Sequence, residues 1–222
     1  MDLKIKDISL LLNVNEKEIM RLIERREIPF YRINRHFRFN KGEISEWILR
    51  KGGGITGEFV KLQNISKPAY LTELIKNGGI YYNIEADDIK SALANIVELL
   101  PLSENINRET LLSYLLEREE MMPTYIGKGI SVPHPKKPII SETDMQMVAI
   151  CFLKNRFAYG KAGEELHTLF VIISSNQANH LKTLSLISYM LQKNEFAEIL
   201  EKRSSKEEII FEIEKQLMRE KL

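Results

Sequence analysis

The sequence predicts an α/β fold: a layered domain of helices and buried strands, preceded by a small helical unit that carries a hairpin. Three observations support this. Amphipathic stretches alternate with β-rich apolar runs over the later part of the chain. Two short helical stripes and one alternating stretch fill the first 40 residues. The glycine-rich segment KGGGITG, at 51–57, offers backbone freedom and little to pack, so it predicts a linker.

Charge divides the chain at the same place. Residues 1–51 contain twelve Lys and Arg against eight Asp and Glu, a net charge of +4. The rest of the chain has 20 against 23, a net charge of −3, so the overall charge of +1 hides an asymmetry. We expect a basic domain at 1–51, a linker at 52–67 and a second domain at 68–219.

Composition argues against membrane, secreted and metal-dependent classes. The longest apolar runs, 147–153 and 169–173, are much shorter than the roughly 18 residues of a membrane span. Charged residues interrupt the N-terminus, so no signal peptide is expected. The single cysteine gives no disulfide framework and favours a reducing cytoplasm. The histidines lack metal-ligand spacing, so neither metal nor cofactor is expected.

The basic domain opens with two apolar helical stripes. Asn15 followed by Glu18 has the chemistry of a capping box, so the second helix should begin at about Glu16 and end before Pro29. A third stripe follows a second capping signature near residue 40. The stripes are Ile8, Leu11 and Leu12, then Ile19, Leu22 and Ile23, then Ile44, Trp47 and Ile48.

Between the second and third stripes, FYRINRHFRF alternates apolar and basic residues around Asn34-Arg35, which predicts a small hairpin, or wing. Helix, turn, helix, wing and helix is a DNA-binding layout, and basic residues can neutralise phosphates or read guanine edges. A solvated basic face on a small bundle is the alternative. The arginines in question are Arg21, Arg25 and Arg26 on the second helix and Arg32, Arg35 and Arg38 in the wing.

Residues 3–50 resemble the excisionase-like, MerR-related helix-turn-helix family. The resemblance rests on DISLLLNVNEKEIMRLIERREIPFYRI and on the closing FRFNKGEISEWI. Members generally read double-stranded DNA with the second helix and the wing, which implies contacts from Lys17, Arg21 and Arg35, and charge adds Arg25. His36 in the wing is interpreted as a backbone-contacting or packing residue. A single short reading unit also suggests a homodimer on two half-sites.

The second domain alternates helical and extended stretches. Residues 87–101 and 107–123 read as amphipathic helices, each punctuated by a proline. Residues 145–153 and 166–174 are apolar runs suited to a sheet buried on both faces. Residues 180–200 predict one long helix.

The most distinctive motif is IGKGISVPHPKKP, in which His134 lies between two prolines. Pro135 disfavours the helical region for His134, while Gly127 and Gly129 permit close approach of the backbone to an anion. Neutral imidazole is a competent nucleophile at pH 7. Taken alone, the motif favours a histidine in a rigid surface turn, with a phosphoryl acceptor as the alternative.

The stretch LLEREEMMPTYIGKGISVPHP resembles the active-site signature of enzyme IIA components of the phosphoenolpyruvate:sugar phosphotransferase system, of the fructose, mannitol and nitrogen-regulatory type. The similarity runs from about Leu71 to Ile213 and implies a mixed sheet flanked by helices. It implies that His134 accepts a phosphoryl group from the phosphocarrier protein, that Arg118 is its charge partner and that His180 is a second histidine of the site.

Departures from the family pattern lie just beyond the histidine. Pro135 stands where the family usually has glycine, and Lys136 and Lys137 follow it. We place Lys136 beside the phosphoryl group as a supporting residue. Thr124 could donate its hydroxyl to the anion, or it could be a turn residue at a helix end. His167 is either structural or a neighbour of the site.

Three hypotheses follow for the whole chain. The leading one is a cytoplasmic transcription regulator, phosphorylated on His134, of the nitrogen-regulatory type. The second is a phosphocarrier in a sugar-uptake chain whose first domain is only an interaction module. The third is a DNA-binding protein whose second domain has lost its chemistry, which the joint presence of His134, Arg118 and His180 argues against.

Overall fold

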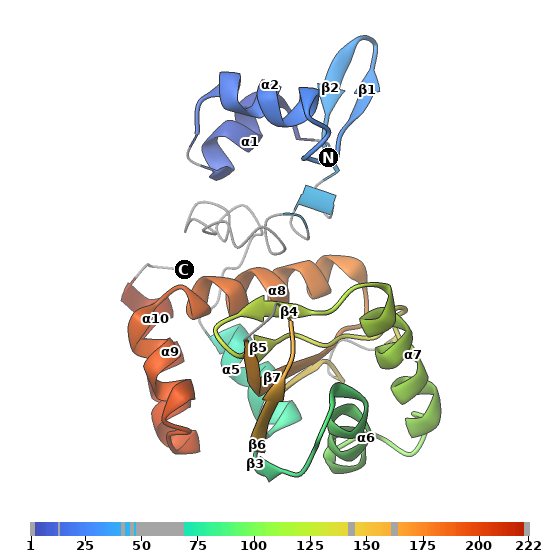
Figure 1. Cartoon of the computed structure of the whole chain (residues 1–222), viewed down its shortest axis with the longest axis vertical. Coiled ribbons are helices and arrows are strands. Elements are labelled where there is room, and N and C mark those ends of the chain that lie inside the picture. The colour runs from blue at the N-terminus through green and yellow to red at the C-terminus, as the bar shows by residue number, and fades with distance from the viewer. Residues whose placement is uncertain are drawn as a thin grey trace.

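A computed structural model describes residues 3–12, 14–40, 43–44, 47, 69–141, 145–160 and 164–219. The sequence-predicted linker at 52–67 and Ile48 of the third apolar stripe therefore lie outside the described residues. Figure 1 shows the N-terminal elements and, separately, a sheet covered by helices. The mixed α/β fold with a helix-turn-helix unit in front of it is confirmed.

Of the predicted N-terminal elements, the described residues include the first two helices and the hairpin in full, and residues 43, 44 and 47 of the third helix are also helical. The side chain of Asn15 accepts a hydrogen bond from the Glu18 N–H at 2.9 Å, so the second helix begins at Glu16. Trp47 donates its indole N–H to the Glu27 carbonyl and ties the third stripe to the turn after that helix. The elements are α1 (Ile5–Leu12), α2 (Glu16–Glu24), β1 (Tyr31–Ile33) and β2 (His36–Arg38).

The second domain is built on one five-stranded mixed sheet in the order β3-β6-β7-β5-β4. The pairs β3/β6 and β5/β7 are parallel, whereas β6/β7 and β4/β5 are antiparallel. The strands are β3 (Ile80–Ile84), β4 (Tyr125–Gly127), β5 (Ile130–Ser131), β6 (Met147–Ala158) and β7 (Glu165–Ile173). The helices are α5 (Ala69–Gly78), α6 (Ile89–Leu99), α7 (Arg108–Met121), α8 (Gln177–Leu191), α9 (Asn194–Glu201) and α10 (Lys206–Arg219).

Alternation along β6 creates two cores, one on each face of the sheet. Val148 and Ile150 belong to the cluster that includes α5, α8, α9 and α10, while Ala149 and Cys151 belong to the cluster of α6 and α7. Figure 1 shows these two helix groups on opposite sides of the strands. Both faces are buried, which is why the strand reads as a continuous apolar run.

The single helix predicted at 180–200 is wrong, because the structure divides this stretch into α8 and α9. The Gln192 N–H bonds the Tyr189 carbonyl at 3.3 Å, and the Lys193 N–H bonds the Met190 carbonyl at 3.0 Å, which tightens the last turn of α8. Lys193 then takes an extended conformation, with φ −80° and ψ 123°, and the chain turns into α9. Apolar spacing continues through the break, so periodicity did not reveal it.

Among the residues that the structure describes, no helix combines the length and apolar character that crossing a membrane requires.

Candidate functional site

The His134 segment is held by two elements of the fold. The Ile172 N–H of β7 donates to the Pro133 carbonyl at 2.9 Å, and the Lys136 N–H donates to the Tyr114 carbonyl of α7 at 3.1 Å. The two prolines have no N–H of their own and a restricted φ. The segment is therefore anchored on both sides of His134, and its imidazole is presented between β7 and α7.

Both ring nitrogens of His134 have partners that specify its tautomer. Nδ1 lies 2.9 Å from the carbonyl oxygen of Val132, which can only accept, so Nδ1 carries the hydrogen. The Arg118 Nε–H donates to Nε2 at 3.1 Å, so Nε2 offers its lone pair. Arg118 is itself steadied by an Nη1–H bond of 2.8 Å to the Met122 carbonyl. The network thus leaves the ring's free lone pair on Nε2 and its hydrogen on Nδ1.

His180 stacks beside His134 from the first turn of α8. Asn176 caps this helix by accepting the Asn179 N–H at 2.9 Å, which fixes the turn that carries His180. The two imidazole centroids are 4.3 Å apart, with 47° between the ring planes. The Nε2 atom of His180 is buried, and no described residue forms a hydrogen bond with it. A polar atom is therefore available where the two rings meet.

Both imidazoles are held in the neutral form. Burial, then the neighbouring His180 and Arg118, lower the pKa of His134 well below its ordinary value, against the opposing effect of the Val132 carbonyl. Burial and the Arg118 charge lower the pKa of His180 to about 4. At pH 7 both rings are therefore uncharged, which is the form that a nucleophilic imidazole needs.

A cavity of about 300 Å³ opens over the two histidines. The three residues that the sequence singled out as reactive, His134, Arg118 and His180, all line it. Lys136 lines it too, and its ammonium pairs with the exposed Glu117 carboxylate at 3.4 Å. Sequence reasoning missed the polar residues that follow β7, because nothing in their spacing marks them: Ser174, Asn176 and Gln177 complete the polar lining.

Gly127 and Gly129 lie away from this cavity: Gly127 ends β4, and Gly129 is the second residue of the turn that joins β4 to β5. Gly127, Lys128 and Gly129 all have positive φ, of 97°, 53° and 70°. The two-residue turn requires this left-handed backbone at Lys128 and Gly129, whereas Gly127 has its positive φ at the register irregularity that ends β4, and glycine adopts such a φ at little cost. A Cβ on Gly129 would lie 2.1 Å from Cδ2 of His167, so close packing also excludes a side chain there. The two glycines therefore have a structural explanation.

His167 packs beneath that turn and lines a different cavity, so the structure separates it from His134. Its Nε2 lies 3.0 Å from the Lys128 carbonyl and 3.0 Å from a Glu201 oxygen, and its Nδ1 lies 2.8 Å from the Thr168 hydroxyl. Burial lowers its pKa, although the Glu201 charge opposes that effect. All these contacts fit the structural interpretation of His167.

Thr124 is also placed away from the cavity. Its hydroxyl donates to the buried Glu119 carboxylate at 2.7 Å, and its N–H donates to the other oxygen at 2.8 Å. A hydroxyl held in this way is not available to an anion above His134. Of the expected supporting residues, the structure therefore brings only Lys136 to the cavity.

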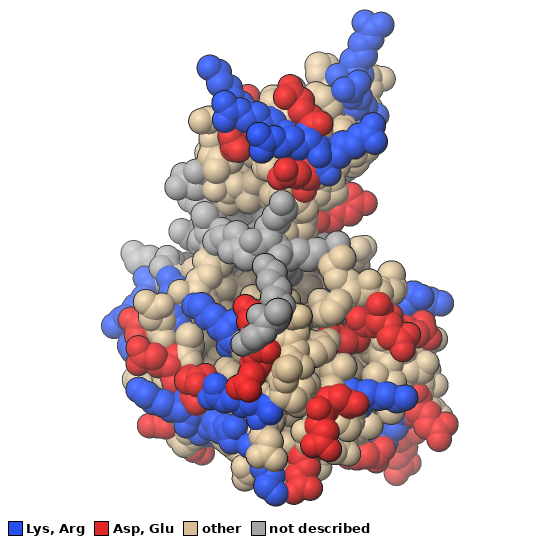
Figure 2. Space-filling view, viewed as in Figure 1, with Lys and Arg blue, Asp and Glu red and all other residues tan. Residues whose placement is uncertain are grey.

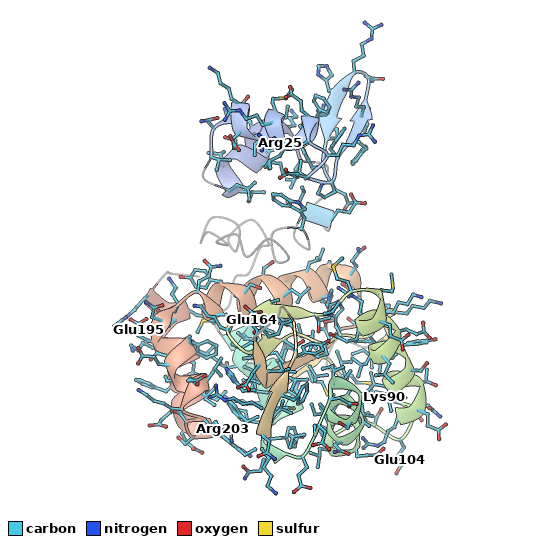
Figure 3. All side chains as sticks on the ribbon, in the orientation of Figure 1. Arg25, Lys90, Glu104, Glu164, Glu195 and Arg203 are labelled. Atoms are coloured by element: carbon cyan, nitrogen blue, oxygen red, sulfur yellow. The ribbon has the colours of Figure 1, made fainter. Side chains whose placement is uncertain are left out.

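In the N-terminal unit, basic residues share one side of α2. Lys17, Arg21 and Arg25 are exposed and spaced four residues apart, which places them on one helical face. Arg21 pairs with Glu18 at 2.9 Å yet keeps 65% of its side chain exposed. Figure 2 shows Lys and Arg gathered over this unit, and Figure 3 labels Arg25 within it.

The wing turns at Asn34 and Arg35, whose φ values are 48° and 66°. Both values are left-handed, as a two-residue hairpin turn requires, and Arg35 is exposed at its tip. Not every arginine is equally available. The Arg32 guanidinium lies 4.6 Å from the centroid of the Phe37 ring, and Arg38 donates to the Phe37 carbonyl at 2.8 Å. Arg35 is therefore the wing residue best placed for a partner.

No group of three or more His, Cys, Asp or Glu residues suited to a metal ion occurs within the described parts of the chain.

Comparison with known proteins identifies two matched regions. Residues 73–216 match the family described as "Phosphoenolpyruvate-dependent sugar phosphotransferase system, EIIA 2", and residues 3–52 match a helix-turn-helix domain. The chain is 29% identical over 144 residues to the fructose-specific EIIABC component of Bacillus subtilis (strain 168), covering 63% of this chain and 22% of that protein. Most of that longer relative therefore has no counterpart here.

Two further proteins support the match. The mannitol-specific phosphotransferase enzyme IIA component of Bacillus subtilis (strain 168) is 30% identical over 102 residues, covering 46% of this chain and 70% of that protein. The crystal structure of nitrogen regulatory protein IIA-Ntr from Neisseria meningitidis has a TM-score of 0.51 at 18% identity, covering 69% of this chain and 99% of that chain, which shows a shared fold. This chain thus belongs to the EIIA 2 family of the phosphoenolpyruvate-dependent sugar phosphotransferase system and carries a helix-turn-helix domain at its N-terminus.

Proposed function

We propose that Nε2 of His134 accepts a phosphoryl group from the phosphocarrier protein of the phosphotransferase system. The observation that carries this proposal is the paired hydrogen bonding of His134, in which the Val132 carbonyl holds Nδ1–H and Arg118 meets the Nε2 lone pair. Family membership supports phosphoryl transfer as the reaction class, and the hydrogen bonds of His134 support Nε2 as the reacting atom.

In the proposed step, the lone pair of Nε2 attacks phosphorus and forms a new P–N bond. The P–N bond of the donor's phosphohistidine breaks, and its electron pair returns to the donor imidazole. No proton has to move, because Nδ1 of His134 keeps its hydrogen and the Val132 carbonyl stabilises the positive charge that grows on the ring. Arg118 leaves Nε2 and turns to the phosphoryl oxygens.

Three cavity residues can stabilise the negative charge on the transferred group. The Arg118 guanidinium offers planar, charged N–H donors, and the Lys136 ammonium can exchange its exposed partner Glu117 for a phosphoryl oxygen. His180, in its Nε2–H tautomer, can donate from a buried position to the same group. We assign His180 the part of a helper, since no described residue forms a hydrogen bond with its Nε2 that would fix its tautomer as the Val132 carbonyl fixes that of His134.

The experiment is incubation of the full chain with phosphoenolpyruvate, enzyme I and the phosphocarrier protein. Wild type should take up an acid-labile, base-stable phosphate. The His134→Ala variant should take up none, while His180→Ala should be labelled at a changed rate. His36→Ala, which changes an exposed histidine of the N-terminal hairpin, is the matched control and should label like wild type. Full labelling of His134→Ala would refute the assignment.

We propose that the N-terminal domain, residues 1–51, binds double-stranded DNA. The exposed row Lys17, Arg21 and Arg25 on α2 can meet phosphates or base edges, while Arg35 at the wing tip reaches an adjacent groove. One such unit has a small contact area, so the proposal includes a homodimer on two half-sites. Sedimentation of the protein on DNA should show two chains per site, and one chain would contradict the dimer.

From the two proposals together, we infer that the chain regulates transcription. The proposed domain division has a linker at 52–67 and the phosphoryl-accepting domain at 68–219. A DNA-binding unit has no evident use in a dedicated sugar carrier, which favours a nitrogen-regulatory type of role in the cytoplasm, where both partners occur. The competing role is a phosphocarrier whose first domain is only an interaction module. Rapid onward transfer of the label to a IIB component, with no binding to genomic DNA fragments, would favour that competitor.

A further inference from the structure

A buried carboxylate lies next to Arg118 on α7, and the proposed reaction does not use it. Glu119 is only 5% exposed. Its oxygens accept the Thr124 N–H at 2.8 Å, the Thr124 hydroxyl at 2.7 Å and the hydroxyl of Tyr159. Burial and the Glu119 carboxylate raise the pKa of Tyr159, so its hydroxyl remains a donor. Two donors from the nearby Thr124 and one from the distant Tyr159 therefore converge on the Glu119 carboxylate.

Hydrogen bonds connect this cluster to the Val132 carbonyl, whose contact with Nδ1 of His134 sets the tautomer of that ring. The Thr124 carbonyl accepts the Val132 N–H at 3.0 Å, which holds the start of the Val132 peptide. The Val132 carbonyl in turn accepts Nδ1–H of His134 at 2.9 Å. The Thr124 hydroxyl also lies 2.8 Å from the hydroxyl of Ser131, which precedes Val132. Glu119 is thus connected to the acceptor histidine through Thr124 and Val132.

The same cluster steadies the other partner of His134. Glu119 directly follows Arg118, and its bonds to Thr124 close the chain between residues 119 and 124 into a fixed turn. Within that turn, the Met122 carbonyl accepts Nη1–H of Arg118 at 2.8 Å. Arg118 then meets Nε2 of His134 at 3.1 Å. Both nitrogens of the acceptor ring are therefore set by contacts that depend on Glu119.

We propose that Glu119 is a positioning residue for phosphoryl acceptance, which fixes the Nδ1–H tautomer of His134 and the approach of Arg118 through the Glu119–Thr124–Val132 hydrogen-bond network. This inference rests on the proposed function of His134. Glu119 touches neither the phosphoryl donor nor the acceptor ring, so it acts through its neighbours. Its loss should reduce the rate at saturating donor and leave the KM for the donor protein nearly unchanged.

Two substitutions of Glu119 separate hydrogen bonding from charge. Glu119→Ala removes the acceptor and leaves the donors of Thr124 and Tyr159 without it. Glu119→Gln keeps one carbonyl oxygen for the Thr124 N–H and Tyr159. Its amide N–H can donate to the Thr124 hydroxyl, which then donates to Ser131 instead. The glutamine variant should therefore retain most of the function.

The matched control is Glu120→Ala, because Glu120 is the next residue on α7 and is exposed. It changes the net charge by the same amount and removes the same number of atoms. The variants should be compared by phosphoryl transfer from the phosphocarrier protein, with the folded fraction of each measured by circular dichroism under the same conditions. ¹⁵N NMR of His134 reports which ring nitrogen carries the hydrogen.

For Glu119→Ala we expect a rate at saturating donor that falls roughly 10- to 100-fold, as misplacement of reacting groups by about an ångström produces. Its His134 ring should lose the pure Nδ1–H signature. Glu119→Gln and Glu120→Ala should keep that signature and rates within about threefold of wild type. A Glu119→Ala protein that is folded, transfers at the wild-type rate and keeps the Nδ1–H signature would overturn the proposal, as would a fall in Glu120→Ala equal to that in Glu119→Ala.

If Glu119→Ala does not fold, Thr124→Val carries the test. Valine has a similar shape and keeps the Thr124 N–H and carbonyl, but it removes the hydroxyl that joins Glu119 to Ser131. A several-fold slower rate with a mixed tautomer supports the proposal, and wild-type values for both overturn it. The experiment also distinguishes failure of the proposed function of His134 from failure of the proposed role of Glu119. If the proposed function fails, wild type takes no label, while the ¹⁵N signature of His134 still decides whether the Glu119 network sets the tautomer.

Discussion

Acidification should destabilise the EIIA 2 domain through His180. Burial and Arg118 lower the pKa of this imidazole from 6.5 to about 4 in the folded protein. The unfolded chain has the ordinary value, so between these two pH values the unfolded state binds more protons. The contribution of His180 to stability is therefore fully present above pH 6.5 and is lost as the pH falls toward 4.

The size of the effect follows from the two pKa values. Between pH 7.5 and pH 4.5 a group with these values loses about 2.5 kcal/mol of unfolding free energy. Carboxylates also titrate near the lower pH, so the useful quantity is the difference between wild type and His180→Asn. That difference should change by at least about 2.5 kcal/mol over this range, because the variant lacks the titrating ring and no longer has His180 to lower the pKa of His134.

Urea unfolding of the full chain, followed by amide NMR signals of β6 and β7, measures this difference for the relevant domain. Arg118→Met should weaken the pH dependence, because it removes the positive charge that helps to lower the pKa of His180. The reasoning would be refuted if plots of unfolding free energy against pH ran parallel for wild type and His180→Asn from pH 7.5 to 4.5. They would show that His180 is not buried as a neutral ring.

Three further predictions test separate parts of the structure. Arg118→Ala should slow phosphoryl acceptance about 10- to 150-fold, since a charge-assisted hydrogen bond contributes about 1.5 to 3 kcal/mol; stopped-flow transfer within twofold of wild type would contradict this. Gly129→Ala should destabilise the domain in urea by at least about 2 kcal/mol more than Gly127→Ala, because both have positive φ but only Gly129 has a buried imidazole in the way. Replacing Arg21 and Arg35 with alanine should lower the slope of log affinity for DNA against log salt by about 2, and an unchanged slope would remove them from the interface.

Features that depend on neighbouring residues in the chain were predictable from the sequence. The cap of α2 needs only Asn15 and the backbone three residues later, so its position followed from the residue pattern. Continuous apolar runs in the sequence predicted the buried strands β6 and β7. His134 was conspicuous in the sequence because two prolines flank it. The resemblance of the surrounding stretch to a known family signature implied Arg118 and His180 as the other residues of the site.

Features that depend on tertiary contacts were not predictable in the same way. Gly127 and Gly129 suggested an anion cradle, but the left-handed hairpin turn and the packing of His167 account for Gly129, and a positive φ at the irregular end of β4 accounts for Gly127. Glu119 looked like any charged residue of an amphipathic helix, because its donors come from residue 124 and from residue 159, beyond β6. One sequence does not show which distant donors a side chain will meet.

The most direct test of the account is the position of the phosphate on the phosphorylated protein. Long-range ¹H–¹⁵N and ³¹P NMR of the full chain, after labelling by phosphoenolpyruvate, enzyme I and the phosphocarrier protein, identifies both the histidine and the nitrogen. The account predicts phosphorus on Nε2 of His134, with hydrogen still on Nδ1 facing the Val132 carbonyl. Phosphorus on Nδ1 of His134, or on His180, would contradict it.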